Sequence, residues 1–129
     1  MTNAIWSSQK ALAAALTDAG VTTFPALPER ATAPFRYVLL DTLEPGSTFG
    51  SYNVSFQVLC VGKPGQNTAV VEQVTDLAVE VIRAVPDIDG YALGSPVVGQ
   101  LGDFLLNGTP HLAAPVIVNA RISRAAMEV

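Results

Sequence analysis

The chain has 129 residues, a length that favours a single domain with one hydrophobic core. Half of its residues are hydrophobic and only 14% are charged, against roughly 25% in typical soluble domains. The net charge is −4, and the seven Lys and Arg residues form no cluster, which argues against a nucleic-acid-binding protein with a basic patch. Because few charges are left to cover a monomer, we expect part of its apolar surface to meet a partner.

The one cysteine, Cys60, excludes an internal disulfide and a cysteine metal cluster, and it predicts a reducing compartment. Cys60 lies within an alternating pattern, so we expect a small buried hydrophobe rather than a nucleophile. We expect no targeting segment, because Lys10 interrupts the first apolar stretch. No apolar run reaches the roughly 18 residues that a membrane span needs.

An amphipathic helix is predicted for residues 4–19, with Asn3 as the N-cap and Gly20 as the C-terminal stop. Its apolar face carries Ile5, Leu12, Leu16 and Ala19, opposite Lys10 and Asp18. Residues 21–34 contain three prolines, so little regular structure is expected there. A strand with both faces partly covered is predicted for residues 35–40.

A second strand is predicted for residues 52–61, where side chains alternate between two faces. One face carries Tyr52, Val54, Phe56, Val58 and Cys60, and the other carries Asn53, Ser55, Gln57, Leu59 and Val61. Towards its end the strand is therefore apolar on both faces. We expect it to pair antiparallel with residues 35–40 across a loop at residues 41–51. A long loop with an aromatic tip, here Phe49, is typical of a contact function.

A second helix is predicted for residues 69–85, capped by Asn67 or Thr68 and stopped by Pro86. Its core face holds Val70, Val74, Leu77, Val81 and Val85, widened by Val71, Ala78 and Ile82. Short strands at residues 91–100 and 103–106, a last strand at 115–123 and a frayed or partner-bound tail at 124–129 complete the chain. The pattern predicts one α+β domain over residues 1–129, with a mixed, mainly antiparallel sheet and two helices packed on it.

The second helix also carries an acidic stripe, because Glu72, Asp76 and Glu80 follow one another at a spacing of four residues. Arg83 lies three residues beyond Glu80 and can relieve part of the repulsion, and Val79 interrupts the polar face. The stripe is either a solvated helix face or a surface that faces a partner or an acidic passage. Acid–base catalysis is not favoured, because nothing indicates a desolvated pocket.

His111 is the only histidine, and no other candidate metal ligands stand at a suitable spacing from it. The sequence also contains no G-x-S-x-G nucleophile elbow that would suggest a Ser-His-Asp triad. We therefore expect a surface or edge histidine. Lys63 stands between two glycines, but the segment lacks the spacing of a phosphate-binding loop and has Pro64 in its turn. The sequence predicts no catalytic residue, no metal and no cofactor.

The order of these elements resembles the tail terminator proteins of long-tailed phages, and those of phages infecting actinobacteria look most similar. The resemblance is carried by "LEPGSTFGSYNVSFQVLCVGKPGQNTAVVEQVTDLAVEVIRAV" at residues 43–85 and by "NGTPHLAAPVIVNARIS" at residues 107–123. Together the two stretches show the family's pattern: an aromatic-capped loop, an alternating strand, a polar break, a valine-rich amphipathic helix and an L-A-A run into the last strand.

This resemblance implies a tail-terminator-like fold and a non-enzymatic virion protein of the tail or neck, assembled in the cytoplasm of the host bacterium. Such proteins form a homo-hexameric ring that caps the tail tube, ends its polymerisation and presents a docking surface to a head-completion or neck protein. DNA passes through the ring without specific binding, and no membrane is involved.

On this hypothesis two surfaces are candidate sites. The partner-contact loop comprises Glu44, Ser47, Phe49 and Tyr52. The channel or subunit-contact stripe comprises Glu72, Asp76, Val79, Glu80 and Arg83. Two alternatives stay open: another head–tail connector or tail-tube-like neck protein, or, in a different class, a small oligomeric enzyme or ligand-binding domain with a site between subunits. A deep polar pocket would favour the last of these.

Overall fold

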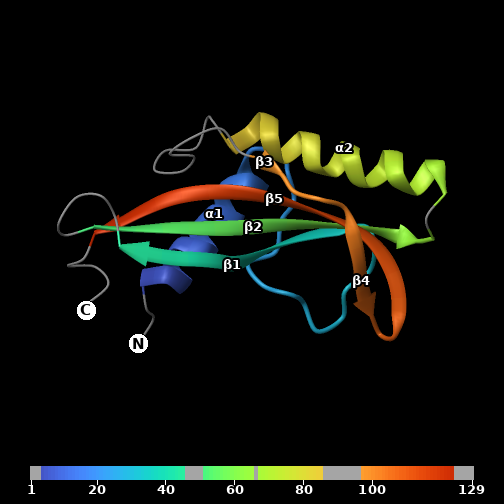
Figure 1. Cartoon of the computed structure of the whole chain (residues 1–129), viewed down its shortest axis with the longest axis horizontal. Coiled ribbons are helices and arrows are strands. Elements are labelled where there is room, and N and C mark those ends of the chain that lie inside the picture. The colour runs from blue at the N-terminus through green and yellow to red at the C-terminus, as the bar shows by residue number, and fades with distance from the viewer. Residues whose placement is uncertain (1–3, 46–50, 66, 86–96, 124–129) are drawn as a thin grey trace.

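The computed structural model describes residues 4–45, 51–65, 67–85 and 97–123, which form two helices and an antiparallel sheet of five strands (Figure 1). In chain order the elements are α1 (Ala4–Asp18), β1 (Phe35–Pro45), β2 (Ser51–Pro64), α2 (Thr68–Ala84), β3 (Val97–Val98), β4 (Gly102–Leu106) and β5 (Thr109–Ser123). The predicted α+β class with helices packed on a sheet is confirmed. The expected N-cap Asn3, the stop at Pro86 and the tail 124–129 lie outside the described residues.

The three long strands β1, β2 and β5 form the body of the sheet, and β2 lies in the middle. On the side away from β2, β5 pairs with β3 and, nearer the start of β5, with β4. β1 and β2 pair from Phe35 opposite Val61 to Pro45 opposite Tyr52, with a bulge at Asp41. The predicted loop at residues 41–51 was therefore too long, because pairing resumes after the bulge although the side-chain alternation is broken there.

β5 starts at Thr109, six residues before the predicted start at Pro115. The reason is a tight hairpin: Asn107 and Gly108 both have positive φ, 53° and 80°, as a two-residue turn between antiparallel strands requires. This turn joins β4 directly to β5.

The end of α1 confirms Gly20 as the stop signal. Gly20 has φ +90°, its N–H donates to the carbonyl of Thr17 at 3.0 Å, and the N–H of Val21 donates to the carbonyl of Leu16 at 2.8 Å. This is the paired-bond arrangement that ends many helices at glycine. Ala19, which was predicted on the core face, is exposed, although its N–H still donates to the carbonyl of Ala15 at 3.1 Å.

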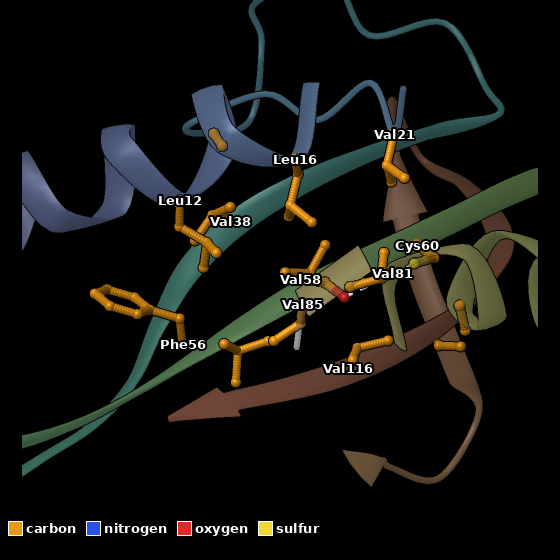
Figure 2. Close-up of a cluster of buried hydrophobic side chains, with 14 of the residues drawn as sticks. Leu12, Leu16, Val21, Val38, Phe56, Val58, Cys60, Val81, Val85 and Val116 are labelled. Atoms are coloured by element: carbon orange, nitrogen blue, oxygen red, sulfur yellow. Dashed lines mark hydrogen bonds between the residues drawn. The ribbon is translucent and has the colours of Figure 1, made fainter. Parts of the chain in front are cut away.

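Both helices cover the same face of the sheet, so one core lies between them and the strands. α1 packs over β1, and α2 packs over β2 and β5. Figure 2 shows side chains from α1, three strands and α2 converging on this core, among them Leu12, Leu16, Val38, Phe56, Val58, Val81, Val85 and Val116. Of the two predicted caps, Asn67 is the one that caps α2: its side-chain oxygen accepts from the N–H of Val70 at 3.1 Å, and Thr68 is the first residue of the helix.

Among the described residues, the opposite face of the sheet is covered at the end where β4 lies. Phe104 of β4 packs against Phe35 and Tyr37, with ring centroids 6.5 Å and 6.0 Å apart. Val61 is fully buried in the same cluster, to which Ala31 and Ala33 also belong. At this end, the apolar second face of β2 is therefore covered by other parts of the same chain.

The contact between α2 and β2 leaves no room for a side chain at Gly62. A Cβ there would overlap Cγ2 of Val74, so we expect Gly62→Ala to lower the free energy of unfolding by about 1–3 kcal/mol through overpacking. Gly102→Ala is the matched control, because a Cβ at Gly102 meets no atom within 4 Å. Urea unfolding followed by circular dichroism measures both, and equal stability of the two variants would contradict the tight packing of α2.

Candidate functional site

Two members of the predicted partner-contact loop, Glu44 and Tyr52, have backbone positions at one end of the sheet. Glu44 is paired with Asn53, and Tyr52 is paired with Pro45 on one side and with Ile122 on the other. These pairs hold the ends of β1, β2 and β5 side by side (Figure 1). Ser47 and Phe49 lie outside the described residues. Glu44 and Tyr52 therefore lie close together; Tyr52 belongs to β2, as predicted, and Glu44 belongs to β1 rather than to the predicted loop.

The outer edge of β1 is covered over only part of its length. The N–H of Phe24 donates to the carbonyl of Arg36, and the N–H of Val38 donates to the carbonyl of Phe24, each at 2.9 Å. From Leu39 to Pro45, no strand in the described part of the chain pairs with this edge. Unpaired strand edges are templates for pairing with another chain.

Exposed apolar side chains accompany the open parts of the sheet. Leu40 is 42% and Leu43 is 40% exposed on the open stretch of β1. Val97 of β3 is 59% and Leu105 of β4 is 69% exposed at the opposite margin. Single exposed apolar residues need no explanation, but here they lie at both lateral margins of one sheet. We name the open stretch of β1, residues 39–45, the β1 margin.

The predicted stripe on α2 is solvent-exposed, and one of its members has a fixed partner. Glu72, Asp76, Val79, Glu80 and Arg83 are all exposed. The carboxylate of Glu80, however, forms an ion pair with the guanidinium of Arg36. Arg83 was expected to relieve the charge of Glu80, and the structure gives that role to Arg36. Val71, expected on the core face, is 39% exposed.

Arg36 connects three parts of the fold from a buried position. Its side chain is only 7% exposed. Nε donates to the carbonyl of Leu77 at 3.2 Å, and Nη1 donates to the carbonyl of Thr22 at 3.1 Å, while Nη2 donates to Glu80. A buried charge must be paired and hydrogen-bonded. The sequence could have indicated this role, because Arg36 shares a strand face with Val38. An arginine buried on that face needs an acidic partner from the element packed against it.

Cys60 is fully buried opposite Arg36 in the strand register, which confirms the predicted small hydrophobe. Burial raises the pKa of its thiol to about 12, and the neighbouring Arg36 guanidinium opposes part of this rise. A neutral thiol is a poor nucleophile. Cys60 therefore packs in the core and offers no chemistry at ordinary pH.

The prediction of a surface or edge position for His111 is wrong: the residue is only 5% exposed. It became buried because β5 starts early, which places His111 inside the sheet beside the irregular end of β2. Nδ1 lies 2.8 Å from the carbonyl oxygen of Gly62, so a proton on Nδ1 makes this hydrogen bond. Among the described residues, no group of three or more His, Cys, Asp or Glu is placed to hold a metal ion.

A pocket of about 350 Å³ lies between residues 22–34, the start of β1 and α2. Its lining residues are Thr22, Phe24, Pro28, Arg30, Ala31, Thr32, Pro34, Phe35, Arg36 and Leu77. They include no histidine, cysteine or carboxylate, so this part of the pocket offers no acid–base pair. In the described part of the chain, neither helix has the length and apolar character to cross a membrane.

Arg36 and Glu80 are expected to contribute unequally to stability. Arg36→Met should lower the free energy of unfolding by about 2–3 kcal/mol, because two backbone carbonyls lose their donors. Glu80→Gln should cost less than about 1 kcal/mol, because the Glu80 side chain is 54% exposed and water screens the pair. Asp76→Asn, also exposed on α2, is the control. Urea unfolding decides, and equal losses for the first two variants would contradict this ranking.

Cys60 should make the protein less stable in alkali. The pKa of its thiol is about 12 in the fold and ordinarily 9.0, so the unfolded chain releases this proton first. The contribution of Cys60 is complete below about pH 9 and is lost as the pH rises through its folded pKa. We expect wild type to lose more stability than Cys60→Val between about pH 8 and pH 10.5, measured by urea unfolding. Parallel losses in the two proteins would refute the assignment.

Comparisons with known proteins do not name a family for this chain. No model of a known protein family matches it, and neither does any curated protein. The resemblance to phage tail terminators therefore stays a prediction from the ordered residue pattern.

Proposed function

We propose that the chain is a phage tail terminator: a virion protein that forms a homo-hexameric ring, caps the tail tube, ends its polymerisation and docks a head-completion or neck protein. The observation that carries the proposal is the β1 margin, where β1 has no strand neighbour among the described residues from Leu39 to Pro45. The residue pattern described for residues 43–85 and 107–123 supplies the family hypothesis.

An open margin with exposed leucines favours assembly with copies of the same chain. The backbone N–H and C=O groups of such an edge can pair with a second strand, and Leu40 and Leu43 gain cover in the same contact. Val97 and Leu105 lie at the other lateral margin of the sheet. When two different surfaces meet from copy to copy, the contact is heterologous, and a rotation that closes produces a ring.

The charge of the chain supports a passage for DNA rather than a binding site for it. Glu72 and Asp76 are exposed, and the net charge is −4. Phosphate groups are held by clustered Lys and Arg, and an acidic wall repels them. On this proposal Glu72, Asp76, Val79 and Arg83 face the channel or a neighbouring subunit, and Glu80 mainly holds Arg36.

The ring is testable by light scattering after size-exclusion chromatography. We expect a mass of about six times 13.5 kDa, either alone or after mixing with purified tail tubes. Leu43→Arg should prevent assembly, because it places a charge in the covered margin. Leu27→Arg is the matched control, since Leu27 is 47% exposed elsewhere. A monomer under both conditions would remove the ring proposal.

The capping role needs a separate test in phage particles. Deleting the gene should give over-long tails without heads in negative-stain images, because nothing ends tube growth. Supplying the wild-type protein should restore normal tails, and supplying Leu43→Arg should not. Tails of normal length that lack heads would identify a connector instead, and normal virions would remove any neck role.

A further inference from the structure

The pocket beside Arg36 has the charge of an anion site. The residues described as lining it include two charged ones, Arg30 and Arg36, and no acidic one. Glu80 balances the charge of Arg36, so Arg30 supplies the net positive charge. Arg36 is held in place by Leu77, Thr22 and Glu80, which gives the pocket a fixed wall.

The rest of the lining is apolar and partly aromatic. Two aromatic residues belong to the lining: Phe24 is 41% exposed, and Phe35 is buried. Pro28, Pro34 and Leu77 add flat or aliphatic surface. A volume of about 350 Å³ is at the lower end of the range for small-molecule sites, roughly 300–1,000 Å³. The pocket therefore matches a ligand with a ring and a single anionic group.

We propose that this pocket binds a small aromatic carboxylate, with its ring against Phe24 and the prolines and its carboxylate on Arg30. A guanidinium group can bind a carboxylate through two parallel hydrogen bonds, so Arg30 can select a planar carboxylate by its geometry, which the point charge of a lysine cannot do. The described lining has no nucleophile beyond the hydroxyls of Thr22 and Thr32, so the site binds without reacting. It lies within one chain and is independent of ring assembly.

The test is a titration of the ¹⁵N-labelled protein with phenylacetate, followed by NMR. We expect saturable shifts at Thr22, Phe24, Ala31 and Leu77. Phenylacetamide, which has the ring but no charge, should bind at least about tenfold more weakly. Inorganic phosphate, which has charge but no ring, should not displace phenylacetate at equal concentration.

Arg30→Gln separates this proposal from general anion binding. Arg30 is exposed, so its replacement should leave the fold intact and weaken phenylacetate binding about tenfold or more. Arg83→Gln removes an exposed positive charge from α2 and should leave binding unchanged. Equal binding of phenylacetamide, equal binding to Arg30→Gln, or shifts confined to other parts of the chain would each overturn the proposal, as would the absence of saturable shifts.

Discussion

The length of the central strands determines how the helices must be arranged on the sheet. β2 has 14 residues and spans about 46 Å, whereas α2 has 17 residues and spans about 26 Å. One helix cannot cover such a sheet, so α1 and α2 share one face between them (Figure 1). In the described part of the chain no helix covers the second face. There, Val61 is buried under β4 and residues 31–33, while Ser55 and Gln57 are hydrogen-bonded polar residues at the uncovered end.

Arg36 shows how a buried charge can connect elements that touch little otherwise. Its guanidinium brings together α2, the start of β1 and the chain that follows α1. The pair with Glu80 has one buried and one half-exposed member, so water still solvates the carboxylate. The acidic stripe on α2 therefore has two parts: Glu72 and Asp76 remain available to solvent or a partner, and Glu80 belongs to the fold.

Sequence patterns predicted the elements whose periodicity is strong, and they failed where a contact between distant residues decides. α2 and its capping residue Asn67 were predicted closely, because valines repeat at helical spacing. The early start of β5, and with it the burial of His111, was missed because local turn signals do not give a strand's length. The pair between Arg36 and Glu80 spans 44 positions in the chain, and it forms because α2 packs over β2 and β5 with Glu80 within reach of Arg36 on the neighbouring strand β1.

The bulge at Asp41 has a consequence for how the sheet border meets other chains. The extra residue resets the alternation, so Leu40 and Leu43, three positions apart, both fall on the side of the sheet that the helices occupy. A regular strand would have turned Leu43 to the opposite side. A bulge also bends and twists its strand, which hinders flat stacking by unrelated polypeptides. The bulged edge of β1 is therefore expected to bind only a partner surface whose shape matches the bend.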